Sequence, residues 1–255
     1  MYILNEKEYI RNILVSNQKP AELSIGYLIT LIAKYYFNNA TDAESLSELV
    51  KKKLSNFEIE NYQEYTYHKR IISICQGLFS ENIDYRLKER EFVPIYIDEI
   101  NLINMLPDDR QKKVMFTLFA VARYMECGGW INKKDSKGLS EIFKLANVTL
   151  TCAKRNELLH ELYKNGYISF GKKIDNLNIQ IELKASGETA YKIHEFKNIG
   201  NQYIANFKKG FKQCKKCGRV IKITGTNKQY CNTCSKAASA INNIKRIKKC
   251  RENKI

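Results

Sequence analysis

Apolar and polar side chains alternate with a helical period through most of the first 90 residues. Over residues 23–35 the apolar positions recur every three or four residues, which predicts a helix with one buried face. Two asparagines then break the pattern, and Thr41 or Asp42 can cap a following helix whose apolar stripe ends at Leu54. A third helix is predicted over residues 62–79. The pattern predicts a helical region and indicates no chemistry in it.

The next hundred residues begin with a strand-like stretch and two helices. Residues 93–97 are extended in character and lead into an amphipathic helix that Pro107 stops. Two aspartates then open a strongly apolar helix over residues 114–125, which a pair of glycines ends. This helix has few polar positions, so we expect it to be buried.

A short helix, a longer helix and two strands complete this region. Residues 139–146 have the pattern of a short amphipathic helix, and a tight turn follows. Thr149 can cap a longer helix that reaches Asn165. Two strand-like stretches come next, over residues 167–170 and 177–183, with a polar loop between them.

This succession resembles a winged helix-turn-helix domain. The resemblance implies that the two helices pack at a steep angle and that the longer helix fits the major groove of DNA. The side chains then expected to contact bases and phosphates are Thr149, Thr151, Lys154, Arg155 and Asn156. The resemblance further implies that Lys172 and Lys173, at the tip of the hairpin, touch the backbone of the flanking groove.

Four of the eight cysteines form a metal-ligand pattern. Cys214 with Cys217 and Cys231 with Cys234 make two Cys-x-x-Cys pairs separated by 13 residues. Zinc prefers four thiolates in a tetrahedron, and the two-residue gap lets both sulfurs of one turn reach the same ion. The stretch resembles a zinc ribbon, which predicts one structural zinc ion. A redox pair or disulfides are the alternatives, although a redox pair would not recur at this spacing.

Positive charge is concentrated beside these cysteines. The chain carries a net charge of +16, and from Phe207 onward it has 15 Lys and Arg residues and one acidic residue. Such a concentration favours nucleic acid as a partner, and less often an anionic membrane surface. The cations expected to contact DNA are Lys215, Lys216, Arg219, Lys245, Arg246, Lys248, Lys249 and Arg251. The last five lie in a helix predicted over residues 237–254, for which membrane binding or a disordered solubilising tail are the other interpretations.

Other classes of protein fit the sequence less well. No apolar run approaches the length of a membrane helix and no apolar signal core opens the chain, so we expect a cytoplasmic protein with no membrane partner. The three histidines are far apart and no glycine-rich phosphate loop is present, so we expect no enzyme. Asp175, Glu182 and Lys184 faintly resemble a metal-dependent nuclease motif, but the strand alternation puts the last two on the outer face of the hairpin.

These patterns predict a fold that is mainly α with a small β component (α+β). The expected parts are a helical region at 1–90, a winged helix-turn-helix at 91–190, a linker at 191–210, a four-cysteine zinc ribbon at 211–236 and a basic helical tail at 237–255.

Site-specific binding of double-stranded DNA is the function expected of this organisation. It resembles transcriptional regulators or replication-initiation factors of bacteriophages and mobile elements, and the helices at 1–90 would mediate self-association or bind a protein. The alternative is an adaptor or inhibitor that binds a protein through its winged helix and N-terminal helices, while the basic tail holds nucleic acid non-specifically. A third possibility is binding of single-stranded RNA by the ribbon and tail.

Overall fold

The chain forms two compact units, Met1–Phe92 and Val93–Ile255, whereas the sequence pattern predicts a boundary after Arg90. The structure is a computed structural model that describes residues 2–57, 59, 64–80, 84–126, 128–131, 136–171, 178–183, 187–224, 228–237 and 239. Within these residues helices predominate and the sheets are small, which confirms the expected mixed, mainly helical composition.

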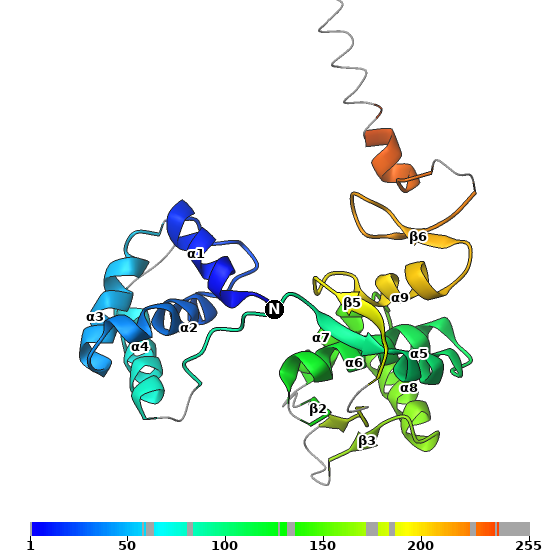
Figure 1. The fold of residues 1–255 in the computed structure, drawn as a ribbon, viewed down its shortest axis with the longest axis horizontal. Helices are drawn as coiled ribbons and strands as arrows, with labels where there is room; N and C mark the ends of the chain where they lie inside the picture. The colour runs from blue at the N-terminus through cyan, green and yellow to red at the C-terminus, as the bar shows by residue number, and fades with distance from the viewer. Residues whose placement is uncertain are drawn as a thin grey trace, which may run out of the picture. The chain divides into compact units, whose positions relative to one another are not determined.

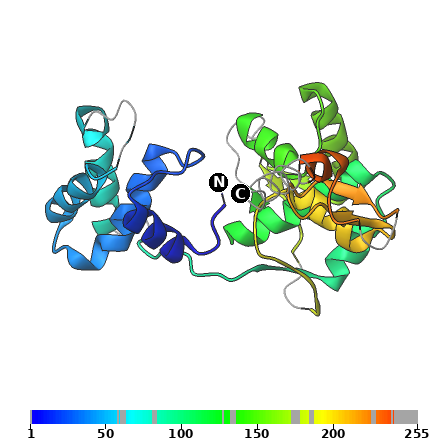
Figure 2. The same ribbon diagram turned by 90° about the horizontal axis from the view of Figure 1, so that it is seen from above.

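The first unit is helical. Its elements are α1 (Glu6–Ser16), α2 (Ile25–Tyr36), the short 3-10 helix η1 (Phe37–Asn39), α3 (Ala43–Leu54) and α4 (Glu64–Phe79). Helices α2, α3 and α4 lie side by side in Figures 1 and 2 and enclose an apolar core. Asp42 caps α3 by accepting the Ser45 N–H while the Ser45 hydroxyl accepts the Asp42 N–H. The three predicted helices are therefore confirmed, and α1 is an addition to them.

A buried carboxylate joins the start of the first unit to its end. Glu6 is 4 % exposed and accepts a hydrogen bond of 2.6 Å from the Tyr27 hydroxyl and one of 2.9 Å from the Lys88 N–H. The Arg90 N–H donates to the Leu4 carbonyl nearby. Because every oxygen of the buried Glu6 carboxylate has a donor, its burial is compensated and the two ends of the unit are held together.

Helix α6 is the centre of the second unit. The elements of this unit are β1 (Val93–Tyr96), α5 (Ile97–Asn104), α6 (Asp109–Met125), β2 (Trp130–Ile131), α7 (Ser136–Leu145), α8 (Cys152–Lys164), β3 (Ser169–Phe170), β4 (Ile179–Gln180), β5 (Thr189–Ile193), α9 (Ile199–Phe207), β6 (Phe211–Gln213) and β7 (Val220–Lys222). The stretch 114–122 of α6 is buried on all sides, as the sequence predicts. It packs against α5, α7, α9, β1 and β2.

The described residues of this unit form three small antiparallel sheets, two of which pack against α6 while the third packs against α9. Strand β1 pairs with β5, so that Val93 lies opposite Ile193. A second sheet has the order β2-β4-β3, and a third consists of β6 and β7. The β2-β4-β3 sheet thus joins the hairpin that follows α8 to a strand that precedes α7.

The structure corrects the predicted beginning of the helix at α8. Its N-cap is Thr151 rather than Thr149, with the Thr151 hydroxyl accepting the Lys154 N–H, and the helix begins at Cys152. The preceding turn contains Asn147, which has the left-handed backbone conformation with a φ of 54°. Val148 is buried in that turn, and Thr149 and Leu150 lie between it and the N-cap Thr151.

Residues 191–210, expected as a linker, hold the end of β5 and the whole of α9. Helix α9 packs on α6 through Tyr203, whose ring centroid lies 5.4 Å from that of Phe116. Buried Gln202 donates to the carbonyls of Glu195 and Lys197 and so fixes the chain before the helix. The segment is therefore part of the core of the second unit and not a linker.

Candidate metal centre and nucleic-acid interface

The four predicted cysteine ligands come together beside the β6–β7 hairpin. Cys214 directly follows β6, and Cys231 precedes a helical stretch at 232–237. The four Sγ atoms all lie within 4.8 Å of one another. Cys214 and Cys231 are buried, and Cys217 and Cys234 are half-buried. The sequence spacing therefore located a real cluster of potential ligands.

A glycine shapes the turn that carries the first pair. Gly218 has a φ of +66°, in the left-handed region that glycine adopts without strain. Its N–H donates to the Cys214 carbonyl over 2.9 Å, and the Cys214 N–H donates to the Arg219 carbonyl over 2.8 Å. This tight turn allows both sulfurs of the pair to face the same point.

Backbone N–H groups prepare one buried thiol to carry negative charge. The Cys231 N–H donates to Cys214 Sγ over 3.2 Å. Burial raises the pKa of Cys214, but hydrogen bonds from the backbone of Cys231, Cys217 and Lys216 outweigh burial and lower that pKa to about 6. Hydrogen bonding to the Cys231 sulfur, together with burial, raises the pKa of Cys234 to about 12. A cation among the sulfurs would favour the thiolate form of all four.

The sulfur positions fit a metal ion. A tetrahedral shell with metal–sulfur bonds of about 2.3 Å places neighbouring sulfurs about 3.8 Å apart, and Cys217 Sγ lies 3.7 Å from Cys231 Sγ. All four cysteines of the cluster are free thiols, as are Cys75 and Cys152 elsewhere among the described residues. The cluster can therefore hold a metal ion, and four sulfur donors are the set that a soft or borderline cation prefers.

The side chains predicted to read DNA lie around the beginning of α8. Thr149, Thr151, Lys154 and Asn156 are exposed there. Arg155 is half-buried, and its guanidinium lies over the Phe143 ring of α7, 5.6 Å from the centroid. Arg155 therefore contributes to the packing of α8 on α7, while the other four side chains face solvent.

The other predicted DNA contacts fall into two groups. Lys215, Lys216 and Arg219 are exposed on the turn of the first cysteine pair. The hairpin-tip residues Lys172 and Lys173 lie outside the described residues, as do the tail cations Lys245, Arg246, Lys248, Lys249 and Arg251. Most of the helix predicted over 237–254 lies outside them too.

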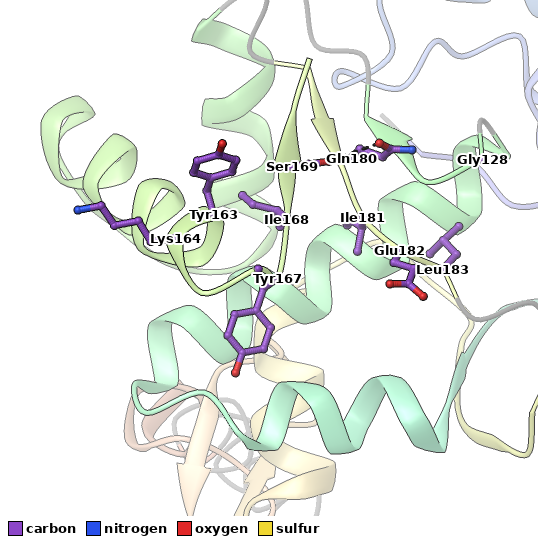
Figure 3. Close-up of a pocket in the computed structure, with 11 residues that line it drawn as sticks. Gly128, Tyr163, Lys164, Tyr167, Ile168, Ser169, Gln180, Ile181, Glu182 and Leu183 are labelled. Carbon is purple, nitrogen blue, oxygen red and sulfur yellow. Dashed lines mark hydrogen bonds between the residues drawn. The ribbon is translucent and has the colours of Figure 1, made fainter. Parts of the chain in front are cut away.

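A large hollow lies between the end of α8 and the sheet that follows it, and none of the predicted DNA contacts that the structure describes lines it. Figure 3 shows Tyr163 and Lys164 on the last turns of α8, across from Ser169 and Gln180 on the strands. The hollow has a volume of about 840 Å³. Glu182 is the acidic residue in its lining, and its two partners in the nuclease resemblance, Asp175 and Lys184, lie outside the described residues. Within the part of the chain that the structure describes, the hollow thus holds no assembled set of catalytic groups.

Sequence reasoning missed a junction between the cysteine cluster and the helices. Asn198, the N-cap of α9, has a φ of 52° and contacts both the turn before α8 and the turn of the first cysteine pair. An asparagine directly before Ile199 was the available signal of a helix start. Polar residues within 199–207, among them Gln202, concealed it.

The comparisons with known proteins add no relative to this picture. The chain matches no protein-family model, no curated protein and no solved structure. Among the described residues, every helix is too short or too polar to span a bilayer.

Proposed function

We propose that this chain is a zinc-containing protein that binds double-stranded DNA at specific sites and reads the major groove with α8. The observation that carries the proposal is the exposure of Thr149, Thr151, Lys154 and Asn156 around the first turn of α8, within the same compact unit as the cysteine cluster. Hydroxyl, amide and ammonium groups are the donors and acceptors that base edges and phosphates recognise.

The arrangement of the second unit supports a winged helix-turn-helix as the DNA-reading module. Helices α7 and α8 are joined by a short turn, and the β3–β4 hairpin follows α8 directly. Strand β2 adds to this hairpin and gives the order β2-β4-β3. A sheet placed beside a helix-turn-helix in this way would hold the hairpin next to DNA when α8 enters the groove.

The four-sulfur cluster supports zinc as the resident ion. Zinc has no geometric preference that competes with a tetrahedron, and four thiolates leave no coordination position for water or substrate. The ion would therefore be structural. Exposed Lys215, Lys216 and Arg219 on the first cysteine turn would then contact phosphates and add affinity that does not depend on base sequence.

A regulator or a replication-initiation factor of a phage or mobile element is the role we attach to this activity. The first unit, with its own core of helices, would serve for self-association or bind a protein partner. In this division of roles the second unit binds DNA. A protein with that role would act inside the cell, where its DNA is.

The adaptor alternative is favoured by one observation. His160 stacks on Tyr163, and Tyr163 in turn contacts Phe170, with ring centroids 6.1 and 5.3 Å apart. Tyr163 is 47 % exposed. Exposed aromatic side chains are common at protein interfaces, so this row on α8 and β3 would be the contact surface if the partner were a protein.

Selection from random pools tests the proposal. Zinc-loaded full-length protein is incubated with random duplex and random single-stranded DNA and RNA, and the retained molecules are sequenced. We expect a common motif in the duplex pool. We also expect the logarithm of the binding constant to fall by about 0.9 per phosphate contact for each tenfold rise in salt concentration. Enrichment of single strands alone, or duplex binding without a motif, would contradict site-specific recognition of duplex DNA.

A further inference from the structure

Asn198 bridges the first cysteine turn and the turn that leads into α8. The Asn147 side-chain amide donates to Asn198 Oδ1 over 3.0 Å, and Asn198 Nδ2 donates to the Cys217 carbonyl over 3.3 Å. Cys217 is itself a candidate metal ligand. One side chain therefore connects the backbone of the cysteine cluster to the residue that precedes the predicted DNA-reading segment.

Both asparagines of this bridge have unusual backbone conformations. Asn147 and Asn198 have φ values of 54° and 52°, in the left-handed region where asparagine and glycine are favoured. A Cβ on Gly218 would lie 2.5 Å from Asn198 Nδ2, so the absence of a side chain at Gly218 lets the bridge reach the cysteine turn. The backbone conformations at Asn147, Asn198 and Gly218 together allow the Asn198 side chain to reach the cysteine turn.

Neighbouring contacts make the bridge part of a packed junction. A Cβ on Gly200 would lie 2.0 Å from the Ala146 carbonyl oxygen, so α9 approaches the end of α7 as closely as a glycine permits. Asn201 Nδ2 donates to the Gly218 carbonyl over 3.4 Å, and Lys113 Nζ on α6 donates to Asn201 Oδ1 over 3.2 Å. A change in the cysteine turn would therefore reach the start of α9, and through it the turn before α8.

We propose that Asn198 is a positioning residue that couples metal occupancy of the cysteine cluster to the conformation of the 146–150 turn, and so to DNA binding by α8. The effect on DNA binding rests on the proposed function, whereas the coupling between the metal and the turn involves only this chain and its metal. Without metal, the cysteine turn loses its main restraint, and the Cys217 carbonyl no longer holds Asn198 in place. By linkage, DNA that orders the turn would also raise metal affinity.

Hydrogen exchange of the turn tests the coupling without DNA. The reporters are the amides of Asn147 and Val148, which donate to the carbonyls of Lys144 and Phe143. Full-length protein is compared with one equivalent of Zn²⁺ and after chelation. We expect chelation to speed exchange of both amides about tenfold in the natural chain, within the usual range of allosteric coupling. Unchanged exchange of the turn, with faster exchange in the cysteine module itself, overturns the proposal.

Glycine is the decisive substitution because it keeps the left-handed backbone and removes only the side chain. In zinc-loaded Asn198→Gly, we expect exchange of the two reporters to be about tenfold faster than in the natural chain, with one zinc retained and no further response to chelation. Natural exchange rates in this variant contradict the bridge. If chelation also speeds exchange of the α6 amides, it has loosened the whole unit, and the chelation arm no longer reports on the bridge. The comparison of the two zinc-loaded proteins then tests the bridge by itself.

Two more variants separate the bridge from general effects. Asn17→Gly removes an exposed asparagine side chain at another left-handed position, φ 51°, in the first unit, and should leave the reporters unchanged. Asn198→Asp keeps an acceptor for Asn147 but cannot donate to Cys217, so we expect it to behave as Asn198→Gly does. Natural behaviour of Asn198→Asp would contradict the assigned path.

Duplex affinity then shows whether the coupling serves the proposed function. With a duplex from the selection, chelation should weaken binding by the natural chain about tenfold more than binding by Asn198→Gly. Equal weakening of the two would contradict the DNA consequence. If no duplex is selected, the proposed function fails while the exchange result still stands or falls by itself.

Discussion

The backbone N–H of Cys231 donates a hydrogen bond to Cys214 Sγ over 3.2 Å, although 17 positions separate the two residues in the chain. The second cysteine pair thus supplies a hydrogen-bond donor to a sulfur of the first pair. The apolar core around them is small: Ile221 is the one buried residue that joins Cys214 and Cys231 in the described cluster. A module with so little buried apolar surface depends on its metal for stability.

The first prediction concerns metal content. Protein purified from cells should contain one zinc per chain, and Cys231→Ser should lose it on dialysis because one of the four thiolates is removed while the backbone N–H that donates to Cys214 Sγ is kept. Structural zinc binding contributes roughly 10–16 kcal/mol in zinc-finger peptides that have all their ligands, so a site that lacks one ligand should hold zinc much more weakly. Elemental analysis by mass spectrometry measures the ratio.

Cys152→Ser is the matched control for that measurement. Cys152 is an exposed free thiol at the start of α8 and does not belong to the cluster. This variant should keep one zinc per chain. Equal zinc in the Cys231→Ser and natural proteins would show that the four sulfurs do not form the site.

The second prediction concerns the buried ion pair between α5 and α6. Glu99 is 1 % exposed and accepts a hydrogen bond of 2.5 Å from Arg123, whose guanidinium also lies over the Tyr96 ring. Glu99→Ala removes the buried carboxylate that pairs with the half-buried Arg123 guanidinium, so we expect a loss of about 3 kcal/mol in unfolding free energy. Urea titration followed by the fluorescence of Trp130, the one tryptophan of the chain, reports this unit.

An exposed ion pair of the same unit provides the comparison. Lys208 and Asp109 form such a pair, with side chains 44 % and 46 % exposed. Lys208→Ala should cost less than about 1 kcal/mol, because exposed pairs gain little over solvation. Equal losses of unfolding free energy in Glu99→Ala and Lys208→Ala would contradict a special contribution of burial to the Glu99–Arg123 pair.

The third prediction concerns alkaline pH. The Tyr203 hydroxyl donates to Asn104 Oδ1 over 2.6 Å, and burial, assisted by the negative charge of Asp109, raises the pKa of Tyr203 to about 12. Since unfolded tyrosine titrates near 10, the folded state favours the neutral phenol. The stabilisation is complete below about pH 10 and is lost as pH rises toward 12.

Tyr203→Phe isolates this effect from the other tyrosines. The variant should lose about 1 kcal/mol at neutral pH because its hydrogen bond is gone, but its stability should fall less between pH 10 and 12 than that of the natural chain. Urea midpoints at pH 8, 10 and 11.5, read from Trp130 fluorescence, give the comparison. Parallel decline of both proteins would contradict the assigned pKa.

Local patterns in the sequence predicted many elements of the fold. The period of apolar residues and the capping pair Asp42 and Ser45 act within a few residues, so α2 and α3 could be foreseen. The pairing of Val93 with Ile193 could not, because the partners are far apart and Pro94 lies within β1. Helix α9 was missed because Gln202 is buried while bonded to backbone carbonyls, and sequence pattern reads such a residue as exposed.

The candidate site divides in the same way. The spacing of the cysteines is itself the geometric requirement of a metal, so these four ligands could be predicted directly. The exposure of Lys154 agrees with a role at a groove, whereas the packing of Arg155 on Phe143 depends on how α8 crosses α7. The contact of Asn198 with Cys217 depends on the fold of three turns and has no local signature.

The most direct measurement is the ratio of affinities for a selected duplex and a scrambled duplex of equal length, made with zinc-loaded protein at fixed salt. Lys154→Ala with Asn156→Ala should lower this ratio by about 10-fold or more, since base contacts contribute about 1–3 kcal/mol each. Alanines at Lys215, Lys216 and Arg219 should weaken both affinities alike and reduce the salt slope by about 3. A ratio unchanged by the α8 substitutions would contradict the claim that α8 reads DNA.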